Sequence, residues 1–372
     1  MSTMNRAALA AITLAALSAC SNNDGGGTQE PPGVSNDRPA FLRGAVESKT
    51  YDGTTDDLLT AGLGRSGLAG AAPAVAVATN PTVAELRRLA IYNNYRALVD
   101  MTANGGYGTL YGPNVDASGA ATAGDGKIAG EEHIVFADDG TGRQNVTLMV
   151  QIPNTFNPAS ACIVSATSSG SRGVYGAIGT AGEWGLKKGC AVAYSDKGTG
   201  NGGHDLAANA VNVLLGPRFD AGAAGLFSQF TANLSASDRA AFNSAFPNRW
   251  AYKHAHSQQN PEKDWGRDTL RAIEFAFYMI NQKHGALQDG VRFRTITPAN
   301  TLVIASSVSN GGGAAIAAAE QDTTGLIDGV AVGEPNVNLS APAGVTIRRG
   351  ATTLPASAIG RPLYDYFTLA NL

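Results

Sequence analysis

The chain has 372 residues, enough to bury a sizeable core and to form one large domain or two smaller ones. Its 27 lysines and arginines against 30 aspartates and glutamates give a net charge of −3, which excludes the basic field of a nucleic-acid-binding protein and is too small to indicate a cationic partner. Charged residues make up 15% of the chain and 46 residues are glycine, so we expect a weakly charged, loop-rich protein.

The N-terminal segment, residues 1–20, has the pattern of an export signal. Arg6 supplies a positive charge, and the apolar stretch Ala7–Ala16 has signal-peptide length but is too short to span a bilayer. Leu17–Cys20 resembles a bacterial lipobox, in which Cys20 carries lipid, becomes the mature N-terminus and anchors the protein to a membrane. The alternative is an ordinary signal peptide cleaved nearby, with Cys20 incidental. In both cases we expect an exported protein, either secreted, periplasmic or held at the outer membrane as a lipoprotein.

After the signal, residues 21–38 are predicted to form a polar tether and residues 39–372 the folded domain. Residues 41–125 are predicted to be irregular except for one helix, for which Thr82 is the N-cap. From residue 132 onwards, strands and helices alternate, which favours an α/β fold with a mainly parallel sheet and long loop insertions. The predicted strands are 132–137 and 145–152 (a hairpin), 162–167, 190–195, 301–306 and 326–332; the predicted helices are 83–101, 175–188, 264–284 and 311–320; a polar insertion covers 202–262.

Two cysteines remain if Cys20 carries lipid, and each begins an apolar run. If the runs at Cys162 and Cys190 are neighbouring parallel strands, both cysteines lie at the same end of the sheet, where a disulfide can form in an oxidising compartment. The alternative is a pair of buried thiols. Neither a CxxC motif nor paired histidines accompany them, which argues against zinc.

The segment 301–315, TLVIASSVSNGGGAA, carries the chemistry. A buried strand ends in a tight turn around Ser309, and a helix of small residues follows at once, which is the setting of the G-x-S-x-G nucleophile elbow of α/β-hydrolases. Ser307 stands at the position of the first glycine and is small enough to fit. The backbone N–H of Asn310 is then an oxyanion donor at a helix N-terminus. The alternative is an ordinary Gly/Ser-rich junction between a strand and a helix.

A second oxyanion donor is expected in the loop after the strand that begins at Cys162, which reads SSGSRG over residues 168–173. Ser169 and Gly170 are the candidates, and the alternative is a simple turn at the strand's end. Arg172 in the same loop either binds a carboxylate or caps the loop, and the sequence does not decide between these roles.

A histidine after the serine is missing from the chain. The α/β-hydrolase order is serine, acid, histidine, yet the five histidines (133, 204, 254, 256 and 284) all precede Ser309. One alternative recruits His254 or His256 out of order. The other places the acid, the histidine and the last strands beyond residue 372, so that this chain is an incomplete domain. If these residues were the whole molecule, we would expect poor folding or no activity, because an unpaired serine is a weak nucleophile.

Several segments together resemble the bacterial D-(−)-3-hydroxybutyrate oligomer hydrolases. They are FLRGAVESKTYDGTTDDLLTAGLG (41–64), GRQNVTLMVQIP (142–153), CIVSATSSGSRGVYGAIGTAGEWGLKKGCAVAYSDKGTG (162–200), AHSQQNPEKDWG (255–266) and ASSVSNGGGAA (305–315). The resemblance implies an exported serine esterase that cuts hydroxybutyrate dimers and oligomers to monomers, downstream of poly(3-hydroxybutyrate) depolymerases. It also implies Ser309 as the nucleophile, no metal or organic cofactor, and a full-length protein much longer than this chain.

Two rival functions remain open from the residues alone. One is another exported esterase, of the tannase or feruloyl-esterase type, which would prefer aromatic acyl groups. The other is a non-catalytic surface lipoprotein that binds polymer or sugar, although aromatic residues make up only 7% of the chain and no tryptophan-rich stripe is present.

Overall fold

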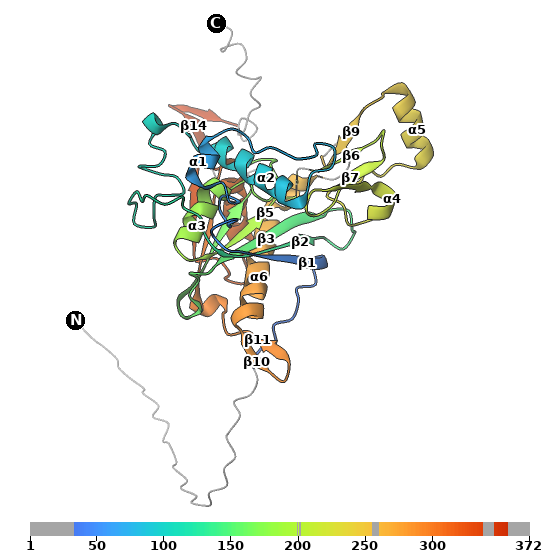
Figure 1. Ribbon diagram of the computed structural model, residues 1–372. Coiled ribbons are helices and arrows are strands. Elements are labelled where there is room, and N and C mark those ends of the chain that lie inside the picture. The colour runs from blue at the N-terminus through green and yellow to red at the C-terminus, as the bar shows by residue number, and fades with distance from the viewer. Residues whose placement is uncertain (1–32, 199, 201, 255–259, 338–345, 356–372) are drawn as a thin grey trace, which may run out of the picture.

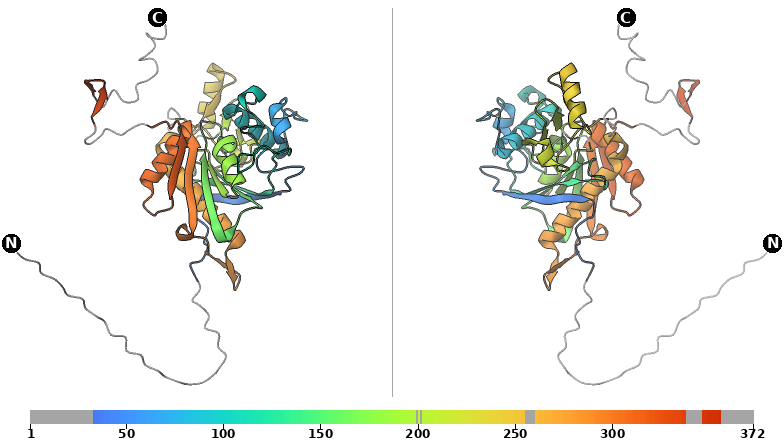
Figure 2. Two further views of the ribbon diagram at one scale, coloured as in Figure 1. Left: turned by 90° about the vertical axis from the view of Figure 1, so that its left-hand side faces the viewer. Right: turned by 90° about the vertical axis from the view of Figure 1, so that its right-hand side faces the viewer.

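The computed structural model describes residues 33–198, 200, 202–254, 260–337 and 346–355. Within these residues a seven-stranded sheet has the order β1-β2-β3-β5-β4-β12-β13. Its strands are β1 (Leu42–Tyr51), β2 (Gly130–Ala137), β3 (Val146–Pro153), β4 (Ala161–Thr167), β5 (Ala191–Ser195), β12 (Thr301–Val308) and β13 (Gly329–Gly333). All of them except β1 and β3 run in one direction, so the sheet is mainly parallel, as predicted. Figure 2 shows the twist between blue β1 and the orange and red strands at the other edge.

Helices cover both faces of the sheet, with α2 (Val83–Leu98) above it and α6 (Trp265–His284) below it in Figure 1. Alternate residues of the strands point to opposite faces. Met149 and Val192 therefore pack in the core between the sheet and α2, whereas Val150 packs in the core between the sheet and α6. This three-layer arrangement is α/β-hydrolase-like. No helix in the described part of the chain is long and apolar enough to cross a membrane.

The predicted helix 83–101 is present but shorter. The Thr82 side chain accepts a hydrogen bond from the Glu85 backbone N–H, and the Glu85 carboxylate accepts one from the Thr82 N–H, so α2 begins with a capping box. The helix ends at Leu98 because the β-branched Val99 is extended, with φ −120° and ψ 126°.

The helix predicted over 175–188 is present in a shorter and irregular form, over residues 178–187. The structure has a π-helical turn at Ile178–Gly182 and a five-residue helix α3 (Glu183–Lys187). Glycines explain the difference: a Cβ on Gly182 or on Gly185 would approach side chains of β4 and β5 to between 2.5 and 3.3 Å. Glycine is therefore required for close packing on the sheet, and it weakens a regular helix.

The irregular region predicted over 41–125 contains a ten-residue strand, β1, and a short helix, α1 (Gly64–Ala69). The strand was missed because it is an edge strand whose middle residues are mostly exposed and polar, so its sequence lacks clear apolar alternation. A register shift between Arg43 and Glu47, with Gly44 at φ +72°, interrupts its pairing with β2.

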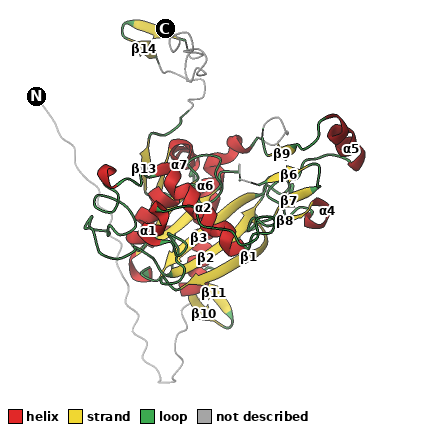
Figure 3. Ribbon diagram, turned by 45° about the horizontal axis from the view of Figure 1, so that its top comes forward, coloured by secondary structure: helices red, strands yellow, loops and turns green. Residues whose placement is uncertain are grey.

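The segment predicted as a polar insertion contains a second, antiparallel sheet of order β8-β7-β6-β9 and two helices. Figure 3 shows it projecting to the right of the central sheet. Its elements are β6 (Gly203–Asp205), β7 (Ala210–Asn212), β8 (Arg218–Asp220), β9 (Trp250–Tyr252), α4 (Ala221–Ala224) and α5 (Ala236–Ala245). Two hairpins lie elsewhere, β10 (Ala286–Gln288) with β11 (Val291–Phe293) and β14 (Ile347–Arg349) with β15 (Thr352–Leu354).

The predicted disulfide between Cys162 and Cys190 is present, with 4.7 Å between the two Cα atoms. The two cysteines are neighbours because β4 and β5 pair in parallel, with Ile163 opposite Ala191. Both therefore lie where these strands begin, at the opposite end of the sheet from Ser309.

Candidate active site

Ser309 lies at a sharp turn between β12 and α7 (Ser309–Gln321). Its φ angle is +54°, a left-handed conformation that costs energy for a residue with a Cβ and is common at functional sites. Its side chain is exposed. A strand that ends in an exposed, strained serine at the start of a helix has the geometry of a nucleophile elbow.

Small residues around Ser309 make this turn possible. Ser307 is buried, and its hydroxyl donates to the carbonyl oxygen of Thr167 in β4 at 2.6 Å. A Cβ on Gly311 would overlap with that same carbonyl and with Ser307 Oγ, and a Cβ on Gly313 would overlap with the carbonyl of Asn336. Only glycine therefore fits at positions 311 and 313, because neighbouring backbone approaches them closely. At position 307, two residues before Ser309, serine is small enough.

The start of α7 offers unpaired backbone N–H groups. No side chain caps this helix, so the N–H of Asn310 in its first turn keeps the positive end of the helix dipole open. On the other side, the Asn336 N–H donates to the Ser309 carbonyl at 3.0 Å and holds the segment after β13 against the elbow. These contacts leave the position predicted for an oxyanion beside Asn310.

The loop with the other two oxyanion candidates follows β4, the strand next to β12. The backbone of β4 touches the elbow through Thr167, and the loop begins at the next residue. The Ser168 N–H donates to the Ser195 carbonyl at 2.8 Å, and Ser168 Oγ donates to the Gly170 carbonyl at 2.7 Å. The fold thus brings the loop of Ser169 and Gly170 beside the elbow, and their oxyanion role stays a prediction.

Three of the described histidines have other tasks. His133 Nδ1 lies 2.8 Å from Ser48 Oγ, and His204 Nδ1 accepts the Ala232 N–H at 3.2 Å. Burial lowers the pKa of both imidazoles. His284 packs against Phe156, with 5.5 Å between the ring centroids. His254 follows β9 and is exposed, and His256 lies outside the described residues.

The acids after Ser309 differ in their positions. Asp322 accepts the backbone N–H groups of Thr324 and Ile327, which makes it part of a turn. Glu334 directly follows β13, two residues before Asn336, and has a φ of +45°. Its side chain is exposed, and its positive φ is the kind of backbone strain that is common at functional sites. Among the described acids after the serine, Glu334 is the one in the segment that Asn336 holds against the elbow.

A cluster of buried charges lies just beyond the end of β5, where sequence reasoning assigned no function. Asp196, Lys197, Lys253 and Asp268 are each at most 4% exposed. Burial, followed by the nearby Asp196 carboxylate, raises the pKa of Asp268 to about 7. Burial also raises the pKa of Asp196 and lowers that of Lys253. No local pattern reveals this cluster, because its members come from distant segments.

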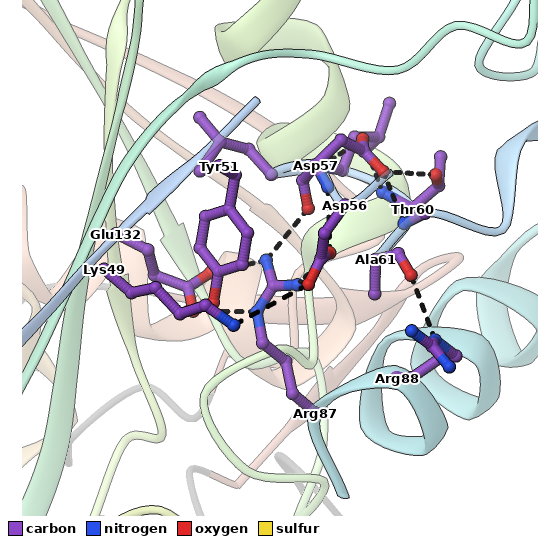
Figure 4. A network of polar contacts seen from close by, with 12 residues as sticks. Lys49, Tyr51, Asp56, Asp57, Thr60, Ala61, Arg87, Arg88 and Glu132 are labelled. Carbon is purple, nitrogen blue, oxygen red and sulfur yellow. Dashed lines mark hydrogen bonds and ion pairs between the residues drawn. The ribbon is translucent and has the colours of Figure 1, made fainter. Parts of the chain in front are cut away.

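On the α2 face, a cavity of about 450 Å³ lies between α2, β1, β2 and the segment around residue 214. Arg87 and Glu132 line this cavity and belong to the network drawn in Figure 4. Arg87 Nε and Nη2 donate to the two oxygens of Glu132 at 2.9 and 3.0 Å. Arg87 Nη1 donates to Asp56 at 3.0 Å, and the hydroxyl of Tyr175 donates to Glu132 at 2.9 Å. Val174 and Tyr175 line this cavity, and they directly follow the loop after β4.

The sheet order, the layers and the elbow at Ser309 define an α/β-hydrolase-like fold. The model of the 3HB-oligomer hydrolase family matches residues 16–372, and the chain belongs to this family. No solved structure matches it.

Curated relatives carry the name D-(-)-3-hydroxybutyrate oligomer hydrolase. The chain is 64% identical over 372 residues to the one from Polaromonas naphthalenivorans, covering 100% of this chain and 51% of the relative. It is 63% identical over 378 residues to the one from Albidiferax ferrireducens, covering 100% of this chain and 53% of the relative. The protein from Paraburkholderia xenovorans is 60% identical over 368 residues, which are 98% of this chain and 51% of that protein. The chain thus spans about half the length of the curated relatives it matches.

Proposed function

We propose that the chain carries the nucleophile and oxyanion part of a serine esterase that hydrolyses 3-hydroxybutyrate dimers and oligomers to monomers, downstream of poly(3-hydroxybutyrate) depolymerases. The observation that carries the proposal is the exposed Ser309 at φ +54°, at the elbow of a chain that belongs to the oligomer hydrolase family. The names of the relatives supply the substrate class.

The reaction follows from the position of the serine. Ser309 Oγ attacks the ester carbonyl carbon while its proton passes to a general base, and the oxyanion forms beside the Asn310 N–H and the loop after β4. Collapse of this intermediate breaks the ester bond, and the leaving alkoxide takes a proton to become the hydroxyl of a 3-hydroxy acid. Water then attacks the acyl group and restores Ser309, so that one water is consumed for each bond cut.

The general base is a histidine in this proposal. The candidates for this base are His254 and His256, which precede the serine in the chain, and a histidine outside these 372 residues. Substitution of each of the first two by alanine decides between these sources. Loss of activity with either variant assigns the base to this chain, and full activity in both assigns it elsewhere.

The test is release of 3-hydroxybutyrate from its linear dimer and trimer. We would compare this chain, a protein of the relatives' length, and the Ser309→Ala variant of each. We expect Ser309→Ala to lower kcat by about a thousandfold or more, because the covalent step is lost. Hydrolysis that persists in Ser309→Ala, or faster cleavage of feruloyl or galloyl esters than of the dimer, would contradict the proposal.

We also propose that the protein is exported and anchored to a membrane through Cys20. Arg6, the apolar stretch Ala7–Ala16 and the cysteine support this, and a disulfide suits an oxidising compartment. Mass spectrometry of the mature N-terminus tests it: a lipid-bearing Cys20 is expected, lost together with membrane association in Cys20→Ser. An unmodified N-terminus at another residue would refute the anchor.

A further inference from the structure

The loop after β4 holds two buried polar groups that have no partner. Arg172 Nη1 and Ser169 Oγ are both shielded from solvent without a hydrogen bond, and within the described residues the Arg172 side chain has no ion pair either. Buried polar groups are nearly always hydrogen-bonded, so two unpartnered ones within four residues need an explanation. A guanidinium only donates and a hydroxyl can donate, so together they suit an anionic ligand.

The backbone of this loop is nevertheless fixed on both sides. Ser168 bonds to β5 through its N–H and to Gly170 through its hydroxyl. Asn94 of α2 donates from Nδ2 to the Arg172 carbonyl at 3.4 Å. Beyond Arg172, Tyr175 is buried and bonded to Glu132. The loop backbone that carries the unpartnered groups is therefore held in place before a ligand arrives, which lowers the entropy that binding must overcome.

The position of the guanidinium relates it to the reaction. A Cβ on Gly170 would lie 3.5 Å from Arg172 Nε, so the arginine side chain folds back over an oxyanion candidate. The same loop begins at the residue after Thr167, whose carbonyl accepts the Ser307 hydroxyl at the elbow. Arg172 thus places a positive charge on the side of the elbow formed by β4.

We propose that Arg172, assisted by Ser169 Oγ, binds the terminal carboxylate of the substrate and thereby directs cleavage to the ester nearest that end. This inference rests on the proposed function. A linear 3-hydroxybutyrate oligomer has one free carboxylate, three bonds from the alkoxy oxygen of its last ester. A planar guanidinium binds a carboxylate through two parallel hydrogen bonds, which fixes both distance and direction. The monomer at the carboxyl end is then the leaving group, and the chain is shortened from that end.

The first test compares the dimer as free acid with its methyl ester, which lacks the charge but keeps the scissile bond. We expect Arg172→Gln to lower kcat/KM for the acid by about 10- to 100-fold, the range for a lost charge-assisted hydrogen bond, and to leave the methyl ester unchanged. Arg172→Lys should restore part of the activity on the acid. Arg143→Gln is the matched control, because Arg143 is exposed and bonds to Asn233.

Three results would overturn the inference. Equal losses on acid and methyl ester would mean that Arg172 acts on the oxyanion or on the loop itself. No loss on either would mean that it has no part in binding. Hydrolysis of the tetramer first to two dimers, in place of a trimer and a monomer, would contradict cleavage at the carboxyl end.

Binding to the Ser309→Ala variant separates this inference from the proposed function. Calorimetric titration should show that the acid binds more tightly than the methyl ester, and that the difference disappears in Ser309→Ala/Arg172→Gln. If the acid binds in this way but the unmodified protein does not hydrolyse it, the carboxylate site stands and the esterase proposal fails. If neither compound binds nor is hydrolysed, both fail. If both are hydrolysed but bind equally well, only the carboxylate site fails.

Discussion

Arg87 is buried and Arg172 is half-buried, and the two show different ways in which this fold holds a guanidinium group. Arg87 is bound by both oxygens of Glu132 and by Asp56, and Glu132 in turn accepts Tyr51, Tyr175 and Gln151. Arg172 has one buried nitrogen without any partner in the described part of the chain. The comparison teaches that a charge whose partners are all present belongs to the scaffold. A charge that a fixed loop presents without a partner marks the place of a ligand.

The largest expected effect on stability concerns the buried ion pair of Arg87 and Glu132. Arg87→Met leaves the Glu132 carboxylate buried without its counter-charge, so we expect the free energy of unfolding to fall by about 3 to 5 kcal/mol. Urea unfolding followed by circular dichroism measures it. Arg88→Met is the control, since Arg88 is partly exposed and bonds to the Ala61 carbonyl at 3.2 Å. A loss of less than about 1 kcal/mol in Arg87→Met would show that Glu132 does not depend on this arginine, and the contrast with Arg172 would lose its basis.

The second prediction concerns Asp268, which lies between the two cases because it is buried among charges of both signs. Its Oδ1 has no hydrogen bond, and Arg271 is 3.9 Å away. Asp196, Asp264, Lys253, Arg267 and Arg271 also act on it. Its folded-state pKa of about 7 is above that of the unfolded chain, so the folded state binds more protons between the two values. Stability therefore falls as pH rises from about 4 to about 7 and then levels.

Asp268→Asn removes this loss. We expect the variant to gain roughly 1 to 3 kcal/mol relative to the unmodified protein between pH 5 and pH 8, measured by urea unfolding across that range. Asp289→Asn, in an exposed turn, is the control for the substitution itself. A difference for Asp268→Asn that is constant with pH would mean that this carboxyl does not titrate in that range.

The candidate site was only partly predictable, and the reason is sequence distance. The elbow could be recognised because strand, turn and helix follow one another within residues 301–315. Gly311 is part of that local pattern, because the Thr167 backbone approaches it too closely to leave room for a side chain. The pair of Arg87 and Glu132 is 45 residues apart, and Asp196 and Asp268 join only after α6 has packed on the sheet. No local pattern encodes such pairs.

The fold was predictable to a similar degree. Buried strands such as β4 and β12 are apolar runs, and their parallel pairing follows from the helices between them. The edge strand β1 escaped prediction because its exposed residues carry no alternation. The helix before β5 is shorter and less regular than predicted because Gly182 and Gly185 pack closely against the sheet, a contact that local sequence does not reveal.

The smallest expected effect is on the stability of the Arg172 loop. Arg172→Gln should change the free energy of unfolding by less than about 0.5 kcal/mol, because its side chain makes no hydrogen bond or ion pair to any residue that the structure describes. Differential scanning calorimetry of Ser309→Ala and of Ser309→Ala/Arg172→Gln, with and without the dimer acid, measures this, because the serine that would cut the ester is absent from both. We expect equal melting temperatures without the ligand and a higher one only for Ser309→Ala with the ligand, since a ligand that binds the folded state stabilises it. A clear fall in the melting temperature of unliganded Arg172→Gln would instead place this arginine in the scaffold, beside Arg87.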